Sequence, residues 1–453
     1  MMNFEWFFDR LASFSERDAV IWRDHEYSYG DLLEGVAEWR EILAEYEIEP
    51  GDSVALCGDF SPDITMLLLA LIANQNIAVP LTPAASVLSE MENYLKTACV
   101  SALFEFDESD SWYFERRHGV GDPPPRLLQT LRERGEAGLI LFSSGSTGQP
   151  KAALHNIAKM LEKFSKKSLR SYRTLPFLLF SHVGGINILF SILCNGGTVI
   201  SPKERTADAI CQAIERYQVE LLPTTPTFMN MLLISGAYKN YDLSSLKLIT
   251  YGSEPMPFAT LESFAEAFPD VQLKQAYGLT ELGVLSTRSD AKDSRRLKMG
   301  SKGYEMKVVD GIIWVRAKSP MLGYLNAPSP FDAEGWFNTG DAVEVKDGYM
   351  RILGRESEII NVGGEKVFPA EVESVILQMD NIKDVTVTGK SNPIIGNVVV
   401  ASVELFEPEE SGVLERRVRQ FCREQLAPFK VPAIVKNASE KLHNARFKKV
   451  RKR

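Results

Sequence analysis

Cysteine is scarce in this chain. Its 453 residues contain five cysteines, which are scattered and form no Cys-x-x-Cys pair. An odd, scattered set excludes the disulfide framework of a small secreted domain, and it lacks the paired spacing of a structural zinc site. We therefore expect reduced thiols.

The sequence also lacks a segment typical of secretion or membrane insertion. Its start carries Glu5 and Asp9, whereas a signal peptide begins with a basic region followed by an apolar one. The longest apolar run, residues 64–73, is about half the length of a membrane span. These features predict a cytoplasmic protein without membrane insertion.

An excess of positive charge is absent as well. The formal net charge is −9, whereas nucleic-acid-binding domains normally carry a basic surface. Nucleic acid is therefore not an expected partner. The chain length suits two or three domains with a large core.

Strand-like apolar segments alternate with helical patterns through most of the chain. Residues 53–57 and 77–80 are strand-like, and residues 64–73 between them are typical of a buried helix. This alternation predicts the α/β class, with a large N-terminal domain of α/β sheets at residues 1–353. Within that domain, short strands with Gly and Asp turns predict a small β segment at residues 300–349.

The last hundred residues are expected to form a separate, small and mobile α+β domain at residues 358–453. Helical patterns at residues 371–379 and 413–426 alternate there with strand-like runs. We place the boundary, as a hinge, at residues 354–357. Further upstream, the polar and proline-containing residues 105–125 are expected to be a surface excursion.

A Ser- and Gly-rich loop in residues 139–151 (LILFSSGSTGQPK) is the most informative stretch. Four apolar residues predict a buried strand, and the small residues after it leave backbone amides open to a ligand. Such a loop suits polyphosphate, although it lacks the Gly-Lys-Ser/Thr of a P-loop; taken alone, a flexible linker is the alternative. A helix is expected after it, at residues 157–168. The expected phosphate-binding residues are Ser143, Ser144, Gly145, Ser146, Thr147, Gly148 and Lys151.

Residues 142–152 (FSSGSTGQPKA) resemble the signature loop of the adenylate-forming enzymes, which include acyl-CoA synthetases, carrier-protein adenylation domains and luciferases. Ala152 stands where that family usually has Gly. Residues 277–281 (YGLTE), 335–341 (GWFNTGD) and 354–373 are similar to three further family motifs, in the family's order. The resemblance is strongest to a compact acid–CoA ligase. It implies that ATP activates a small carboxylic acid to acyl-AMP, and that the acyl group is then transferred to the thiol of CoA, with Mg²⁺ as cofactor.

The motifs also suit an adenosine and metal site by their residue types. Tyr277 can supply an aromatic face for adenine, and Asp341 an acceptor for the ribose hydroxyls. Glu281 is the expected Mg²⁺ ligand, because Mg²⁺ binds a carboxylate together with phosphate oxygens, and Thr280 is expected to touch phosphate. Without the resemblance, a core aromatic and a turn residue are equally good readings of Tyr277 and Asp341. The remaining residues expected to bind the nucleotide are Gly252, Ser253, Glu254, Gly278 and Arg355.

Relatives in this family use a lysine near the C-terminus to stabilise charge at the reacting phosphorus. The resemblance assigns this role to Lys448, within residues 444–451 (NARFKKVR). Asn444 and Phe447 replace the usual Thr and Gly, so Lys449 is the alternative.

The resemblance further implies a hinge between the two half-reactions. Ser357 occupies the hinge position, which is usually Asp or Lys in relatives. Gly363 and Gly364 are expected to line the CoA channel, where missing side chains leave room for pantetheine. Lys366 and the basic tail at residues 448–453 are candidates for contact with CoA phosphates.

The acid is expected to be an aryl or medium acyl acid. The segment around His182 has no carboxylate to pair with an ammonium group, which argues against an α-amino acid. His182 itself resembles the gate histidine of CoA ligases, with a hydrogen-bonded structural histidine as the alternative. The length of the chain is similar to that of compact ligases of aromatic acids such as succinylbenzoate. The residues expected to line the acid pocket are Ile186, Thr225, Phe228, Tyr251, Ala276 and Leu282.

Two other functions remain open from the sequence. One is a stand-alone adenylating enzyme that loads the phosphopantetheine arm of a carrier protein. The other is a non-catalytic nucleotide-binding relative, suggested by the departures at Ala152, Ser357 and Phe447.

The assignment of Lys448 can be tested by mutation. Lys448→Ala should slow acyl-adenylate formation about a hundred- to a thousandfold, the scale of losing one group that stabilises developing charge. Thioester formation from supplied acyl-adenylate should be spared. Normal ATP–pyrophosphate exchange in the variant would reject the assignment.

Overall fold

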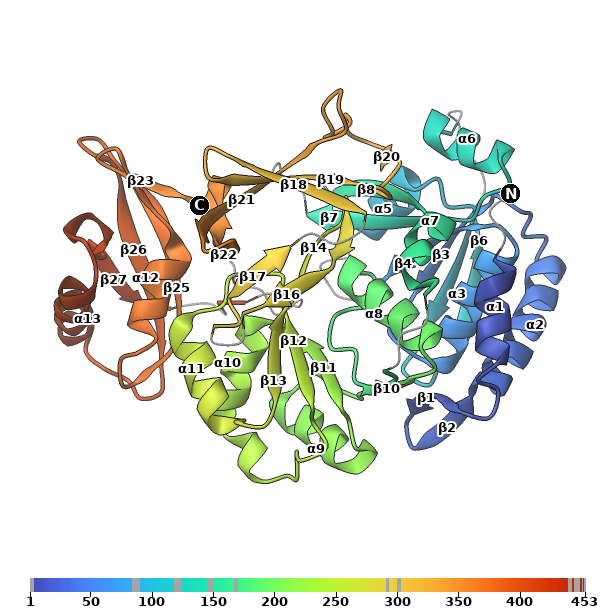
Figure 1. Cartoon of the computed structure of the whole chain (residues 1–453), viewed down its shortest axis with the longest axis horizontal. Helices are drawn as coiled ribbons and strands as arrows, with labels where there is room; N and C mark the ends of the chain where they lie inside the picture. The colour runs from blue at the N-terminus through green and yellow to red at the C-terminus, as the bar shows by residue number, and fades with distance from the viewer. Residues whose placement is uncertain are drawn as a thin grey trace.

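Two seven-stranded sheets form most of the N-terminal part of the chain (Figure 1). The first is largely parallel, and the second is mixed, with a parallel centre and antiparallel strands at both edges. The structure, a computed structural model, describes residues 4–83, 90–117, 124–144, 150–166, 170–290, 293–299, 303–438, 442–443, 449 and 451. The first sheet has the strand order β13-β12-β11-β9-β10-β1-β2 and the second the order β20-β8-β7-β4-β3-β5-β6. The strands of the first sheet are β1 (Asp18–Trp22), β2 (His25–Ser28), β9 (Arg173–Thr174), β10 (Thr198–Ser201), β11 (Leu221–Thr224), β12 (Leu248–Tyr251) and β13 (Gln272–Gln275). Those of the second are β3 (Ser53–Cys57), β4 (Ile77–Leu81), β5 (Ala102–Phe106), β6 (Trp112–Arg116), β7 (Gly138–Ser144), β8 (Pro150–Asn156) and β20 (Gly323–Tyr324).

Helices lie in three layers around these two sheets. The middle layer, between the sheets, holds α1 (Glu5–Ala12), α2 (Tyr29–Glu45), α3 (Pro62–Ala73), α7 (Ile157–Leu161) and α8 (Val183–Cys194). The outer face of the first sheet is covered by α9 (Ala207–Tyr217), α10 (Pro226–Ser235) and α11 (Phe258–Ala267), and that of the second by α5 (Met91–Thr97) and α6 (Arg126–Glu133). In the part of the chain that the structure describes, no helix combines the length and apolar character needed to cross a membrane.

The middle layer explains why some helices lack a polar face. Residues 64–72 of α3 are almost all buried, because sheets lie on both sides of the helix. The start of α3 is fixed by Ser61, whose hydroxyl accepts a hydrogen bond from the Ile64 N–H, and by Pro62 in the first turn. The longest apolar run of the sequence is therefore a helix within the core.

Smaller sheets complete the fold. The third sheet is six-stranded and antiparallel, with the order β16-β17-β22-β21-β19-β18, and it lies beside the hairpin of β14 and β15. These strands are β14 (Tyr277–Leu279), β15 (Gly283–Leu285), β16 (Thr287–Ser289), β17 (Arg296–Met299), β18 (Tyr304–Val309), β19 (Ile312–Ala317), β21 (Phe337–Lys346) and β22 (Tyr349–Arg355).

The C-terminal domain has its own five-stranded sheet and core and lies at one side of the molecule (Figure 1). Helices α12 and α13 pack on this sheet through residues such as Val372, Ile376 and Val418. Its elements are β23 (Ile360–Val362), β24 (Glu365–Val367), α12 (Pro369–Ile376), β25 (Ile382–Asn392), β26 (Gly396–Leu405), α13 (Ser411–Gln425) and β27 (Ile434–Asn437). Short 3₁₀ turns are η1 (Glu162–Phe164), η2 (Ala237–Lys239), η3 (Glu356–Glu358) and η4 (Pro428–Lys430).

The predicted fold class is confirmed, but two local expectations are wrong. Strand β8, which pairs antiparallel with β7, lies between the Ser/Gly loop and the helix that follows it. The helix expected at residues 157–168 ends at Leu161 and continues as the turn η1. The expected surface excursion at residues 105–125 contains strand β6, which pairs with β5 at the edge of the second sheet.

The domain boundary at residues 354–357 stays a prediction. Gly354 and Arg355 belong to β22, where they pair with Ala342 and Asp341 of β21. Ser357 lies in η3, and the C-terminal sheet begins with β23. The link between the two parts of the chain is thus the short stretch that contains Ser357.

Helix α8 gives a stability prediction, because it approaches the preceding backbone at Gly185. A Cβ atom at this position would lie 2.9 Å from the carbonyl carbon of Leu179 and would clash with its oxygen. Gly185→Ala should therefore lower the free energy of unfolding by about 1–3 kcal/mol. At Gly412 in α13 an added Cβ atom would meet no described residue within 4 Å, so Gly412→Ala should change stability by less than about 1 kcal/mol. Urea unfolding of both variants tests the contrast, and equal effects would contradict it.

Candidate active site

The Ser/Gly loop joins two paired strands of the second sheet. Ser143 and Ser144 end β7, Lys151 lies at the start of β8, and the register places Ser143 opposite Lys151. Gly145, Ser146, Thr147 and Gly148 lie outside the described residues. The strand pairing brings both ends of the loop together, so Lys151 lies beside the point where β7 ends.

Tyr324 connects this hairpin to the predicted metal ligand. Its hydroxyl donates to Glu281 Oε1, and the ammonium of Lys151 lies 5.3 Å from the centre of its ring. Burial, together with the nearby Glu281 carboxylate, raises the pKa of Tyr324, so the hydroxyl stays a donor. Asn326 also holds the hairpin, because its amide bonds both Ala152 N–H and Pro150 C=O at 2.9 Å.

A second group of predicted residues surrounds a cavity of about 130 Å³. In this cavity the Tyr277 hydroxyl donates to Asp341 Oδ2 at 2.7 Å, and Arg355 Nε lies 3.4 Å from Asp341 Oδ1. The Asp341 side chain is 9% exposed, whereas Arg355 is half exposed. The predicted residues that line the cavity are Ser253, Glu254, Ala276, Tyr277, Gly278, Asp341, Arg355 and Lys449.

Burial dominates the electrostatics of this cavity. It raises the pKa of Asp341 above its ordinary value, while Arg355 and the Tyr277 hydrogen bond act in the opposite direction. Burial and the Asp341 carboxylate raise the pKa of Tyr277, which keeps its hydroxyl protonated. The cavity therefore offers an aromatic ring and a carboxylate acceptor next to one another, as an adenosine site requires.

The loop after β12 approaches the cavity with an unusual backbone. Ser253 has φ +76°, a conformation that side chains seldom adopt. Gly252 is packed rather than open, because a Cβ atom there would lie 2.6 Å from the carbonyl oxygen of Ala276. Glycine at this position permits contact with the Ala276 backbone, which places Ser253 and Glu254 at the cavity wall.

His182 lies at the start of α8. Its Nδ1 accepts a hydrogen bond from the Gly184 N–H at 3.1 Å and so caps the helix. This contact corresponds to the structural reading of His182, while its role as a gate stays a prediction.

The residues predicted for the acid pocket are distributed over several parts of the core. Ile186 belongs to the layer between the sheets, and Leu282 packs with the third sheet. The rings of Phe228 and Phe177 pack at a tilt with their centres 4.1 Å apart, and the Tyr251 hydroxyl shares a hydrogen bond with Ser294. Thr225 caps α10 through the Phe228 N–H, and Ala276 lines the 130 Å³ cavity.

The predicted residues of the C-terminal domain lie in two places. Gly363 and Gly364 form the turn between β23 and β24 with φ +60° and +90°, and an added Cβ atom would meet none of the described residues within 4 Å. The turn conformation thus accounts for both glycines. Lys448 lies outside the described residues. Lys449 is buried, and its Nζ donates to Val385 O at 2.6 Å.

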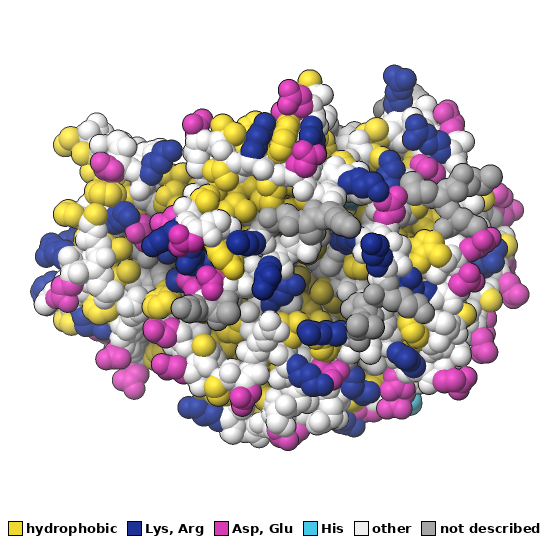
Figure 2. All heavy atoms as spheres, viewed as in Figure 1, with side chains coloured by type: hydrophobic (Ala, Val, Ile, Leu, Met, Phe, Trp, Pro, Cys, Tyr) yellow, Lys and Arg dark blue, Asp and Glu magenta, His cyan; other side chains and the backbone are white. Residues whose placement is uncertain are grey.

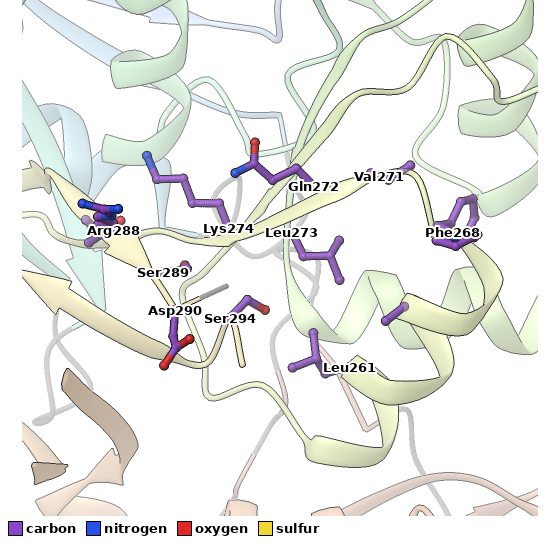
Figure 3. Close-up of a pocket in the computed structure, with 13 residues that line it drawn as sticks. Leu261, Phe268, Val271, Gln272, Leu273, Lys274, Arg288, Ser289, Asp290 and Ser294 are labelled. Carbon is purple, nitrogen blue, oxygen red and sulfur yellow. The ribbon is translucent and has the colours of Figure 1, made fainter. Parts of the chain in front are cut away.

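A larger cavity of about 620 Å³ lies elsewhere, between α11, the edge strand β13 and β16. Figure 3 shows Lys274 and Arg288 near each other on one side of β13, and Leu261 and Leu273 on the other. None of the predicted site residues that the structure describes lines it. We therefore place the candidate active site by its chemistry rather than by cavity volume.

Basic side chains gather across part of one face of the molecule. Figure 2 shows Lys and Arg across the middle of one face, while Asp and Glu are more frequent along its rims. A chain with net charge −9 thus presents a local positive field, which attracts anionic ligands.

Tyr324, Asn326 and His155 are residues that sequence reasoning missed. Tyr324 and Asn326 are brought to the site by the pairing of β20 with β8. The two strands are more than a hundred residues apart in the sequence, and no local spacing indicates that they pair. His155 lies on β8 and hydrogen-bonds the backbone of Thr280, next to Glu281. It is 2% exposed, and burial lowers its pKa from 6.5 to about 4.

The chain is similar to proteins of known activity over nearly its whole length. The family model described as AMP-binding enzyme matches residues 7–325, and the one described as AMP-binding enzyme C-terminal domain matches residues 371–449. The 2-succinylbenzoate–CoA ligase of Bacillus pumilus (strain SAFR-032) is 27% identical over 98% of this chain and 97% of its own length. That of Bacillus subtilis (strain 168) is 26% identical over 99% of this chain and 98% of its own length.

Solved structures share the fold. The anthranilate CoA ligase AuaEII, in complex with anthranoyl-AMP, superposes with a TM-score of 0.82 at 21% identity, covering 98% of this chain and 95% of that one. The o-succinylbenzoate CoA synthetase from Bacillus subtilis, in complex with its acyl-adenylate intermediate, gives a TM-score of 0.79 at 24% identity, covering 98% of this chain and 96% of that one.

The buried His155 gives a prediction for acid stability. Unfolded chains take up a proton at this side chain near pH 6.5, but the folded chain does so only near pH 4. The stability that comes from its neutral burial is therefore present above pH 6.5 and is lost as the pH falls toward 4. Between pH 7 and 5 the wild type should lose about 2 kcal/mol more unfolding free energy than His155→Gln. The control His25→Gln, at an exposed position of β2, should keep the wild-type pH dependence; equal slopes for all three chains would contradict the prediction.

Proposed function

Because this chain belongs to the AMP-binding enzyme family, we propose that it is an AMP-forming ligase that joins a carboxylic acid to the thiol of CoA. The observation that carries the proposal is the cavity in which Tyr277, Asp341 and Arg355 converge. The family match over residues 7–325 supports the same reading.

The reaction has two displacements. A carboxylate oxygen of the acid attacks the α-phosphorus of ATP, and the bond from that phosphorus to the bridging oxygen breaks, which releases pyrophosphate. The sulfur of CoA then attacks the acyl carbonyl carbon, AMP leaves with the electron pair of the broken carbon–oxygen bond, and the thiol proton passes to solvent. No covalent enzyme intermediate is needed, so the protein acts by positioning and by charge stabilisation.

ATP would bind across the two parts of the site. The adenosine would occupy the cavity at Tyr277, with its ribose hydroxyls donating to Asp341. The triphosphate would extend to the hairpin of β7 and β8, where Ser143, Ser144 and Lys151 lie at the ends of the loop. Gly145, Ser146, Thr147 and Gly148 would contribute from the loop itself.

Glu281 fits the requirement for a magnesium ligand. One of its carboxylate oxygens accepts the hydroxyl of Tyr324, and the ring of that tyrosine lies 5.3 Å from the ammonium of Lys151. Mg²⁺ commonly binds one or two carboxylates and takes its other ligands from substrate phosphates and water. When bound, the ion would neutralise charge on the phosphates. Thr280, which precedes Glu281 in the sequence, is proposed to contact phosphate.

Lys448 is the better candidate for the adenylation lysine. The ammonium of Lys449 already donates to Val385 O and lies 3.1 Å from Asp384 Oδ1. A cation committed to these partners is poorly suited to the α-phosphorus, which supports Lys448 on the same tail. The hinge role of Ser357 and the channel role of Gly363 and Gly364 are proposed on the family pattern.

The acid is proposed to be an aryl acid. The relatives named as 2-succinylbenzoate–CoA ligases and the structure with anthranoyl-AMP both involve aromatic acids. Ile186 and Phe228, with His182 at the start of α8, are proposed to face the acid on the family pattern.

The proposal is tested by pyrophosphate release over aryl, short, medium and long acyl acids, with CoA or a carrier protein as the acceptor. We expect release with an aryl acid and thioester formation with CoA. If a thioester formed with the carrier protein and not with CoA, the carrier protein would be the acceptor. No ATP–pyrophosphate exchange with any acid would reject ligase activity.

Asp341 gives a quantitative test of the nucleotide site. Asp341→Asn should raise KM for ATP about ten- to a hundredfold, because hydrogen bonds to a charged acceptor are worth about 1.5–3 kcal/mol. The matched control is Asp347→Asn, at an exposed turn between the same two strands. The control should keep the wild-type KM, and equal values for both variants would contradict the assignment.

A further inference from the structure

Lys449 joins the two parts of the chain through opposite ends of the residue. Its side chain is 8% exposed and points into the C-terminal domain, where Nζ lies 3.1 Å from Asp384 Oδ1 and 3.7 Å from Glu373 Oε2. Its backbone N–H donates to Glu254 Oε2 at 3.3 Å. Glu254 belongs to the loop after β12, which lines the nucleotide cavity.

The charges around Lys449 are buried and paired. Arg451 completes the group, with Nη2 at 2.8 Å from Glu373 Oε2 and Nη1 at 3.0 Å from Glu358 Oε2. Although burial opposes ionisation, the acids raise the pKa of Lys449 and the two cations lower the pKa of Glu373. Removing one member of such a group leaves a buried charge without its partner, which is strongly unfavourable.

Glu254 fixes where this group meets the N-terminal domain. Its other oxygen, Oε1, accepts the Thr227 N–H at 2.8 Å, in the first turn of α10. Thus one partly buried carboxylate holds the start of α10 with one oxygen and the backbone of Lys449 with the other. Another contact between the two parts joins Phe258 N–H to Ser374 Oγ at 2.8 Å, and neither of these residues lines the nucleotide cavity.

We propose that Lys449 is a positioning residue for the first half-reaction, anchoring the C-terminal tail against the nucleotide cavity through Asp384 and Glu254. The inference rests on the proposed function. Asp384 and Val385, at the start of β25, hold the side chain of Lys449 in the C-terminal domain. The backbone of Lys449 therefore reaches Glu254 in the arrangement of the two domains that this structure has. Lys448, the proposed adenylation lysine, is the preceding residue in the sequence. The second half-reaction does not use that lysine and should not depend on the anchor.

The two half-reactions measured separately test this role. With the acid that gives the fastest wild-type pyrophosphate release, Lys449→Met should lower kcat for acyl-adenylate formation about a hundredfold, the cost of a misplaced reacting group. KM for ATP should change little, because Tyr277 and Asp341 are intact. Thioester formation from supplied acyl-adenylate and CoA should keep its wild-type rate. Lys449→Arg should restore most of the lost rate by keeping the charge.

Two further variants guard against a general structural effect. Asp384→Asn removes the charge that faces Lys449 while keeping the shape of the side chain, and it should reproduce the loss in the first half-reaction. Lys383→Met removes a half-exposed lysine of the same domain that pairs with Glu404, and it should leave both half-reactions unchanged.

The outcomes separate this inference from the proposed function. Parallel losses in both half-reactions of Lys449→Met, or no loss in either, would overturn the positioning role alone if the wild type is active. A wild type that releases no pyrophosphate with any acid would overturn both proposals.

Discussion

The nucleotide cavity depends on the partners that a buried carboxylate, Asp341, requires. A charged group with little contact to water is costly unless its oxygens are bonded and an opposite charge is near. Tyr277 and Arg355 meet these needs, and they come from β14 and β22 while Asp341 comes from β21. The hairpin of β14 and β15 must therefore lie against the third sheet, and the cavity forms where they meet.

The same junction ties the third sheet to the first. Gln275, at the end of edge strand β13, donates its N–H to Ser289 Oγ at 2.9 Å and accepts a hydrogen bond from Thr287 Oγ1 at 2.7 Å. Side chains of β16 thus satisfy backbone groups of β13, which is the edge strand of its sheet among the described strands. Ala276 and Tyr277 directly follow Gln275 in the sequence. The hydrogen bonds of Gln275 to β16 therefore help to position the aromatic ring of Tyr277 in the cavity.

Local patterns in the sequence predicted much of the fold and part of the site. The alternation of strands and helices, the buried helix α3 and the separate C-terminal unit follow from periodicity that each segment carries itself. Tyr277, Asp341 and Arg355 were identified through motifs and meet in one cavity.

Local patterns could not predict contacts made by distant segments: Tyr324 reaches Glu281 through the pairing of β20 with β8. The short strand β8 itself was missed because a polar segment with Lys151 and His155 lacks a clear alternation. The buried side chains of the expected acid pocket, such as Phe228 and Tyr251, also show that apolar character alone does not separate a ligand wall from core packing.

The position of Arg355 at the end of β22 has a consequence for nucleotide retention. It pairs in register with Asp341 on the neighbouring strand, and η3 with Ser357 comes after it. A pivot located beyond Arg355 would carry the C-terminal sheet away while the guanidinium stays with the strand that holds the carboxylate. The adenylate would then keep its ribose contacts throughout the swing, and the intermediate would not have to be recaptured between the two steps.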